Sequence, residues 1–401
     1  MTDLNETSIN SVEAISYRYY NYVALIIILG ILIIGKPRKK VDNKNRKLGQ
    51  WTAEDYKPPS PAPYPNWDLN KTGPLPYRAF KHKYNITMGI RNMDWSSWFE
   101  IDNQWFKFHR EKLNRLEKYD TSLYETTKEA LPAAYELLEE MREYLPKRYP
   151  SMFESTEYGI HNKATDEDVN FMGKYRNFNP AKKTGVDPMK LAALLVQDDL
   201  AIMMESKDGQ YILKGGAIIL PGFWKFRDKF NMTLENIHTS GDVPKFKEKL
   251  QSGMEKFFVR LTCDKPVVRN NYFLQTDDQL GWSVSIGNEF KGKVGWGTAD
   301  EATEIEKIHL RSERQSLRRL PKSGAIIFTV RTYFIPITEI VKEPFIPRRL
   351  LNGILSWEED VQDYRGFTKF KDVLLPYLEE KALEQERLGF LPEEGPNVFP
   401  F

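Results

Sequence analysis

The chain has 401 residues, of which 58 are lysine or arginine and 56 are aspartate or glutamate, so its formal net charge is only +2. This near balance argues against nucleic-acid binding through bulk charge, and a hydrophobic content of 41% excludes global disorder. The single cysteine, Cys263, excludes an intramolecular disulfide, a cysteine-based zinc site and an iron–sulfur cluster held by this chain's own thiolates.

The first predicted element is a membrane-spanning helix at residues 19–35. This run is apolar apart from Asn21, and at about 1.5 Å per residue it lies at the low end of the range for a spanning helix. The segment KPRKKVDNKNRK after it is strongly basic, whereas acids predominate in residues 1–18. The positive-inside rule therefore places residues 1–18 in a lumen or outside the cell and the large body in the cytosol. We expect a single-pass membrane protein, with the endoplasmic reticulum as its membrane.

Two other interpretations of this run fit less well. A signal peptide would carry its positive charges before the apolar run and a small-residue cleavage site after it. A buried core helix would present a polar face to solvent, and the run has none.

The rest of the chain is predicted to form a linker, one large domain and a tail. Residues 36–76 are first basic and then rich in proline, as in KPPSPAPYPNW, and such proline density favours an extended spacer. Because no later stretch has the composition of a linker, residues 77–377 are assigned to one domain. Residues 378–401 combine a charged helical tail with a Pro-rich end.

Helical and strand patterns are mixed within this domain. Apolar residues at helical spacing predict helices at 123–145, 189–200, 243–261 and 309–320. Asp187 and Pro188 suit the N-cap and first position of the second helix. β-Branched and aromatic runs predict strands at 268–278, 280–287 and 325–337, and a hairpin around the turn Asp208-Gly209. This order lacks a regular βαβα alternation and favours an α+β fold with a largely antiparallel sheet.

Several enzyme classes are excluded by missing motifs. The sequence has no P-loop, no G-x-G-x-x-G that opens a helix after a strand, no H-E-x-x-H and no G-x-S-x-G. Among the remaining candidates, His238 lies in NIHTSGDVPKF, in an expected loop. It is either an ordinary hydrogen-bonding histidine or the single axial ligand of a haem iron. Cys263 lacks the Gly- and Arg-rich surroundings of a haem thiolate, so we expect it to be a spectator.

The arginine residues of HLRSERQSLRRLP form another candidate. On the predicted helix, Arg311, Arg314 and Arg318 recur at i, i+3 and i+7 and would share one face. That face is either solvated, with Glu313 as a local partner, or it recognises an anion such as a haem propionate or RNA. Arg331 on the next predicted strand has apolar neighbours, and a buried arginine needs a partner.

A further candidate is Asp199, the last acid of Gln197-Asp198-Asp199. Acids are disfavoured at the C-terminus of a helix, so one of them is expected to have a compensating partner. That partner is as often structural as catalytic.

Several segments resemble one known family, the haem-dependent oxidative N-demethylase alpha-subunit-like proteins, and its fungal branch in particular. The resemblance runs from about Tyr77 to Glu380 and rests on KYNITMGIRNMDWSSWFEID, LAALLVQDDLAIM, KGGAIILPGFW and, above all, RSERQSLRRLPKSGAIIFTVRTYF. It implies a PAS-like core with helical additions that binds haem b. Proteins of this kind use dioxygen and electrons from a reductase to remove an N-methyl group as formaldehyde. In the bacterial family an Ile-His precedes a Val-Pro before a helix, and His238 matches that histidine, with residues 239–242 inserted.

A mechanistic hypothesis built on the resemblance gives the candidates expected roles. His238 is expected to ligate the iron, and a carboxylate, Glu313 or Asp199, to orient a small cationic amine beside bound dioxygen. The propionates are expected to be held by Arg311, Arg314, Arg318 and Arg331. The sequence has no flavin, ferredoxin or nicotinamide motif, so electrons are expected from NADPH through a separate membrane reductase, and no nucleic-acid partner is expected.

Two alternatives remain open. One is a haem-binding PAS-type sensor of redox state or gas that lacks turnover. The other is a haem-free, membrane-tethered scaffold whose arginine face binds anionic lipid or RNA.

Overall fold

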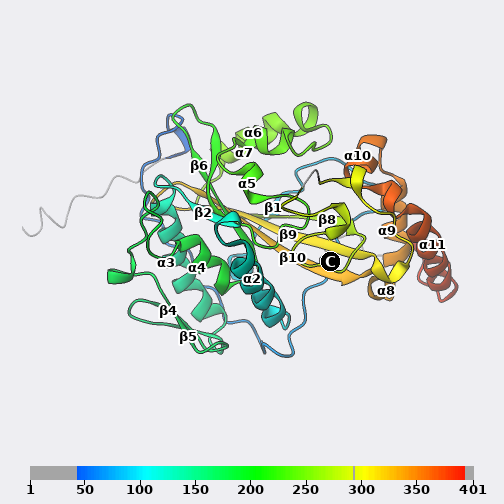
Figure 1. The fold of residues 1–401 in the computed structure, drawn as a ribbon, viewed down its shortest axis with the longest axis horizontal. Helices are drawn as coiled ribbons and strands as arrows, with labels where there is room; N and C mark the ends of the chain where they lie inside the picture. The colour runs from blue at the N-terminus through cyan, green and yellow to red at the C-terminus, as the bar shows by residue number, and fades with distance from the viewer. Residues whose placement is uncertain (1–42, 292–293, 393–401) are drawn as a thin grey trace, which may run out of the picture. The chain divides into compact units, whose positions relative to one another are not determined.

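The computed structural model describes residues 43–291 and 294–392 (Figure 1). The expected spanning helix at 19–35 and the tail before it lie outside these residues, as does the end of the chain from residue 393. Within the two described ranges, no helix is both long and apolar enough to span a membrane. The membrane anchor and the cytosolic location of the body therefore stay predictions.

A seven-stranded antiparallel sheet is the centre of the unit that begins at Asn43. Its strand order is β1-β8-β9-β10-β6-β7-β2, which confirms the expected α+β class, whereas the PAS-like assignment stays a prediction. The strands are β1 (Arg91–Asn92), β2 (Tyr124–Thr126), β6 (Asp199–Glu205), β7 (Tyr211–Ala217), β8 (Val267–Gln275), β9 (His309–Arg319) and β10 (Ile326–Pro336). A smaller sheet contains β3 (Phe153–Ser155), β4 (Gly159–Asn162) and β5 (Glu167–Asn170).

The pairing register divides the residues of the large sheet between two faces. Directly paired residues of antiparallel strands lie on the same face, and successive residues alternate between faces. Arg269 of β8 pairs with Gln315 of β9, which pairs with Val330 of β10, and Val330 pairs with Asp199 of β6. We call the face with these residues the α6 face. The opposite face, the α2 face, carries the residues between them, such as Arg314.

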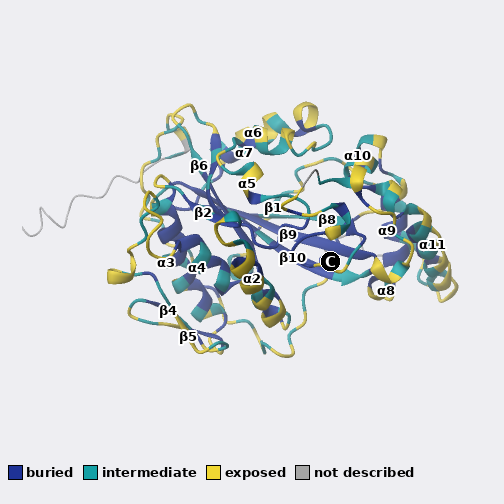
Figure 2. Cartoon of the chain, viewed as in Figure 1, coloured by how far each residue is buried: buried dark blue, intermediate teal, exposed yellow. Residues whose placement is uncertain are grey.

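Helices cover both faces and one end of the sheet. The α6 face lies under α5 (Phe226–Lys229), α6 (Leu234–Thr239) and α7 (Gln251–Arg260), which connect β7 with β8. The α2 face lies under α2 (Trp105–Tyr119), α3 (Leu131–Arg148) and α4 (Pro188–Leu195). The end of the sheet packs against α8 (Ile337–Ile340), α9 (Ile346–Leu355), α10 (Glu359–Tyr364) and α11 (Lys371–Arg387). Figure 2 shows the central strands buried and the outer surfaces of these helices exposed.

Several predicted elements are confirmed. α4 begins with Asp187 as N-cap, whose side chain accepts a hydrogen bond from the Met189 amide at 2.8 Å, and Pro188 occupies its first position. The hairpin of β6 and β7 turns at Gly209, whose φ of 86° requires the freedom of glycine. β10 matches the strand predicted at 325–337. The helix predicted at 123–145 is α3, which begins later because Tyr124–Thr126 pairs with β7.

The prediction of a helix at 309–320 is wrong, because these residues form β9. Every residue of β9 is buried, and the strand pairs with β8 and β10 on its two sides. The polar residues of both faces bind groups in the layers above and below, so the strand lacks the apolar and polar alternation by which a half-buried strand is recognised. The predictions of a strand at 280–287 and of a helix over the whole of 243–261 are also wrong. Residues 280–287 form a loop with a short 3-10 turn, and an α-helix forms at 251–260 only, after a π-helical turn at Phe246–Leu250.

The described part of the expected linker lies against the folded unit. Arg46 forms a buried ion pair with Glu205 at 2.6 Å, and the Trp51 indole donates to the Pro321 carbonyl at 2.9 Å. Further along, the Trp67 indole donates to the Ile101 carbonyl at 2.8 Å. Part of the expected linker therefore packs on the folded unit, and the domain boundary expected at residue 77 stays a prediction.

Candidate functional site

His238 lies in α6, not in the expected loop. Thr233 begins this short helix as N-cap, and the His238 ring stacks on Phe246 with centroids 4.9 Å apart. The Nδ1 atom of His238 is 2.7 Å from the Leu234 carbonyl oxygen. A carbonyl only accepts hydrogen bonds, so Nδ1 carries the proton and donates. In the neutral ring the lone pair is then on Nε2, which is the arrangement found when a histidine ligates a metal.

The surroundings of His238 keep its ring neutral. Burial lowers the pKa of His238, and the nearby cations Arg269 and Lys229 lower it further, against the opposing effect of the Leu234 carbonyl. At neutral pH the Nε2 lone pair is therefore free to bind.

Arg269, on the α6 face near His238, has neither a hydrogen bond nor an ion pair among the described residues. Its Nε atom is buried without a partner, whereas the two terminal nitrogens keep contact with accessible space. Burial lowers the pKa of Arg269, and Glu313 is the acid that most opposes this effect. A guanidinium in this state is open to an external anion.

A second polar group on this face surrounds Glu313. Gln315 donates from Nε2 to a Glu313 oxygen at 2.9 Å, and its own Oε1 is buried without a partner. The Nε of Arg311 lies 3.8 Å from the other Glu313 oxygen. Burial raises the pKa of Glu313, and Arg311 opposes this shift. Tyr364 at the end of α10, whose ring is 5.9 Å from that of Phe273, lies close enough for Glu313 to raise its pKa as well.

The helices do not seal the centre of the α6 face. Phe328 and Val330 of β10 are partly exposed, whereas their neighbours on the α2 face, such as Thr329, are fully buried. On β8, Arg269 and Phe273 are partly exposed too. These partly exposed residues share the α6 face with Nε of Arg269 and Oε1 of Gln315, which are buried without a hydrogen-bond partner.

Two further predicted residues, Asp199 and Arg311, share this face but bind the chain itself. The Asp199 carboxylate accepts hydrogen bonds at 2.9 Å from the Ile219 and Leu220 amides. Arg311 donates to the Leu220 carbonyl and, at 2.8 Å, to that of Leu280. At Gly222, with a φ of 75°, a Cβ would lie 2.6 Å from the Arg311 guanidinium. Both side chains therefore fix the turn after β7.

The other three predicted arginines lie on the α2 face, away from His238. Arg314 donates to the Ser97 and Trp98 carbonyls, and Arg331 pairs with Asp102 at 2.5 Å. Arg318 pairs with Glu140, and its guanidinium lies 4.5 and 4.8 Å from the centroids of the Trp95 and Trp98 rings. Because β9 is a strand, Arg311 faces the layer opposite to that of Arg314 and Arg318, and the expected single arginine face does not form. All of these arginines are at most 1% exposed, so they offer no surface to lipid or RNA.

A buried ionic network also lies on the α2 face. Lys112 of α2 donates to the carbonyls of Ala193, Val196 and Asp198 at 2.9, 3.0 and 2.5 Å, which compensates the C-terminus of α4. Both carboxylate oxygens of Asp198 are buried without a hydrogen bond. Burial raises the pKa of Asp198 to about 6, against the opposing effects of Arg331, Arg314 and Lys112.

We expect Asp198→Asn to change how stability depends on pH. Because the folded pKa of Asp198 is about 6 and its ordinary value is 3.8, the folded chain holds more protons than the unfolded chain between these values. The free energy of unfolding therefore falls as pH rises through this window, by up to about 1.4 kcal/mol per pH unit. Asp198→Asn should remove this fall in urea titrations from pH 4 to 7. The exposed Asp300→Asn should leave it in place, and an identical slope in wild type and Asp198→Asn would refute the assignment.

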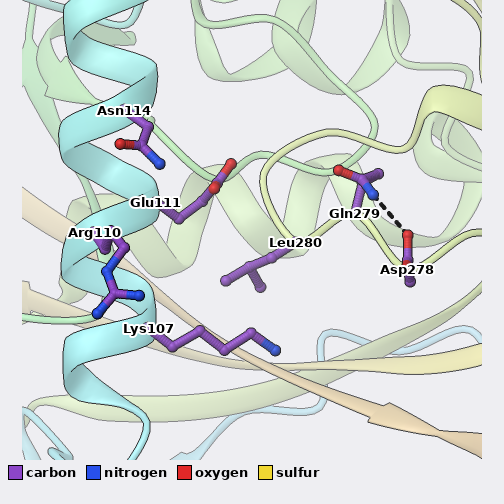
Figure 3. A pocket seen from close by; sticks show the side chains of 7 residues that line it. All are labelled: Lys107, Arg110, Glu111, Asn114, Asp278, Gln279 and Leu280. Carbon is purple, nitrogen blue, oxygen red and sulfur yellow. Dashed lines mark hydrogen bonds between the residues drawn. The ribbon is translucent and has the colours of Figure 1, made fainter.

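Two hollows lie elsewhere and contain no histidine in their linings. The first, of about 350 Å³, lies between α2 and the loop after β8 and is lined by polar side chains, with Gln279 donating to Asp278 at 2.6 Å (Figure 3). The second, of about 510 Å³, lies beside α3 under residues 56–61, and Glu140 is in its lining. Burial raises the pKa of Glu140 to about 7 despite its pairing with Arg318. In the second hollow, Glu139 pairs with Lys322 and Glu143 with Lys147.

Sequence reasoning missed Arg269, Gln315 and Tyr364. The available signal was the arginine in the strand pattern VVRNNYFLQ, because a charge on a central strand needs a partner. Among the described residues no group of three histidine, cysteine or acidic side chains is arranged to hold a metal ion.

Comparison with protein families gives one match. Residues 89–375 match the family described as haem-dependent oxidative N-demethylase, alpha subunit-like. The matched residues contain the large sheet, α6 and the whole of the α6 face.

Proposed function

We propose, for a chain that belongs to the haem-dependent oxidative N-demethylase alpha-subunit-like family, that it binds haem b on the α6 face and removes an N-methyl group from a small amine. The family match supports haem dependence and oxidative N-demethylation. The observation that carries the position of the site is the state of His238: its Nδ1 is bound to the Leu234 carbonyl, which leaves Nε2 free, and the unpaired Arg269 lies on the face on which α6 packs.

The residues of the α6 face fit a haem group. His238 supplies one neutral nitrogen, oriented by a carbonyl as a metal ligand normally is. Arg269 Nε and Gln315 Oε1 are buried polar atoms whose hydrogen bonds are not made within the described protein. Aromatic and aliphatic side chains, among them Phe273 and Val330, supply apolar contact area for the ring.

The chain's own residues have separate roles in the proposed reaction. Haem, when bound, supplies the activation of dioxygen, which no side chain provides. His238 holds the iron, and Phe246 and the Leu234 carbonyl fix the orientation of its ring. Glu313, held by Gln315, orients the amine, whose positive charge compensates the buried carboxylate. In sum, the amine, dioxygen, two electrons and two protons give the demethylated amine, formaldehyde and water.

The electron source and the location form a second part of the proposal. Electrons come from NADPH through a separate reductase, since the sequence contains no flavin or nicotinamide motif. Residues 19–35 anchor the chain in the endoplasmic reticulum with the body in the cytosol, as in a fungal-type member with a PAS-like core. The apolar run and the basic segment after it support this arrangement.

The test uses the full chain, purified in detergent and supplied with haem. We expect one haem per chain, a Soret band with reduced-state bands of histidine ligation, and one formaldehyde per NADPH consumed with a reductase and an N-methylamine. Bovine serum albumin with equal haem controls for non-specific uptake. A chain that stays haem-free would contradict the proposal. A haem-loaded chain that consumes dioxygen with no tested amine would favour the sensor.

A further inference from the structure

We propose that Arg269 binds a propionate carboxylate of the haem and so sets the orientation of the ring on the α6 face. The inference rests on the proposed function and adds a residue that the sequence did not single out. Its basis is the state of Arg269 in the described chain, compared with that of every other arginine on the central strands.

Each of the other central-strand arginines contacts an acceptor of the chain, although Nε of Arg311 and all three nitrogens of Arg318 are buried without a hydrogen bond. Arg311 and Arg314 donate to backbone carbonyls, and Arg319 donates to the Leu261 carbonyl at 2.7 Å and the Tyr211 hydroxyl at 2.7 Å. Arg318 and Arg331 pair with the carboxylates of Glu140 and Asp102. Each of these five side chains therefore already has an acceptor in the protein.

Arg269 differs from them because no acceptor of the described chain contacts it. Among the described residues it has no ion pair and no hydrogen bond, although its Nε is buried. Glu313 is the acid with the largest effect on it, yet Glu313 accepts from Gln315 and lies 3.8 Å from Arg311. A partly buried guanidinium is costly without an anion, and its fork of N–H groups matches a carboxylate.

The position of Arg269 selects the source of that carboxylate. Arg269 lies on the α6 face, and the helix that contains His238 packs on the same face through Leu234 and Ile237. A haem held by His238 would lie over this face, and Arg269 would be available to one of its propionates. Lys229, the other cation near His238, already donates to the Ile237 carbonyl at 3.2 Å and the Ser240 hydroxyl at 2.7 Å. Arg269 is thus the cation left for the propionate.

The experiment compares haem b with its dimethyl ester, in which both propionates are blocked. In Soret titrations of the full chain, Arg269→Gln should weaken binding of haem b by at least about tenfold, the effect of losing a charge-assisted hydrogen bond. The affinity of Arg269→Lys for haem b should lie between those of wild type and Arg269→Gln. The dimethyl ester should bind wild type and Arg269→Gln alike. The histidine-ligated spectrum of the remaining complex should not change, because His238 is intact.

Control variants and apoprotein stability separate this assignment from misfolding. The exposed Arg260→Gln on α7 should bind haem b as wild type does. Because Arg269 lacks a partner in the protein, apo Arg269→Gln should unfold at the same or a higher urea concentration than apo wild type. Wild type that binds no haem overturns both this inference and the proposed function. Two results would overturn the inference alone, provided that wild type binds haem. In the first, Arg269→Gln binds haem b as tightly as wild type does. In the second, Arg269→Gln weakens binding of the dimethyl ester as much as it weakens binding of haem b.

Discussion

Replacing His238 by alanine is expected to remove the histidine-ligated haem spectrum and to reduce formaldehyde production to background. The physical reason is that His238 combines a donated Nδ1 hydrogen with a free Nε2, and α6 packs on the face that carries the unpaired Arg269. Added imidazole should restore part of the spectrum, since the alanine leaves a space of matching shape. The change is followed by absorption of the oxidised and dithionite-reduced protein.

Two other histidines provide matched controls for this prediction. His109 places Nδ1 3.2 Å from the Leu194 carbonyl and stacks on Trp105, and His309 places Nδ1 3.0 Å from the Lys307 carbonyl. They resemble His238 in tautomer but lie away from Arg269. Alanine variants of both should keep the spectrum. Loss of the Soret band in His109→Ala or His309→Ala, with His238→Ala unaffected, would move the iron to another part of the fold.

The second large effect is expected from Asp102→Ala, in the core of the α2 face. Arg331 is fully buried and pairs with Asp102 at 2.5 Å, so removal of the carboxylate leaves a buried charge without its partner. Two donors, the Gln104 amide and the Gln197 side chain, lose their acceptor as well. We expect the free energy of unfolding to fall by about 3–5 kcal/mol, measured by urea titration at neutral pH.

A double variant isolates the charge from the lost contacts. Asp102→Ala combined with Arg331→Met removes both partners, and we expect it to be more stable than Asp102→Ala alone. The exposed Asp300→Ala serves as the control for a neutral loss of one acid. A fall below about 1 kcal/mol in Asp102→Ala would show that Arg331 finds another partner, and the ionic network would then contribute little to stability.

The sequence predicted the fold class and the elements with local signals better than it predicted the site. The N-cap at Asp187 and the turn at Asp208-Gly209 depend on neighbouring residues, and the structure confirms both. The strand β9 was predicted as a helix because the spacing of its arginines fits a helical face as well as two strand faces. Only the partners decide between these interpretations, and those partners come from residues more than 200 positions away for Arg314.

The candidate site could be predicted only in part for the same reason. His238, Glu313 and Asp199 were chosen from the sequence, and the structure places them with α6 or on the face beneath it. Arg269 was missed because the lack of a hydrogen-bond partner can be recognised only when the positions of the neighbouring residues are known. Conversely, Arg314, Arg318 and Arg331 look like anion ligands in the sequence, yet carbonyls and acids of this chain bind them.

The way in which β9 binds both layers has a consequence for folding during synthesis. Its arginines donate to carbonyls of residues as distant as Ser97 and Leu220, and these donors emerge from the ribosome only after some 300 residues have been made. Until then the two layers have acceptors without donors and no central strand on which to assemble. We therefore expect nascent chains that end before β9 to remain protease-sensitive and to depend on chaperones, and the transition to a resistant form to occur in one late step.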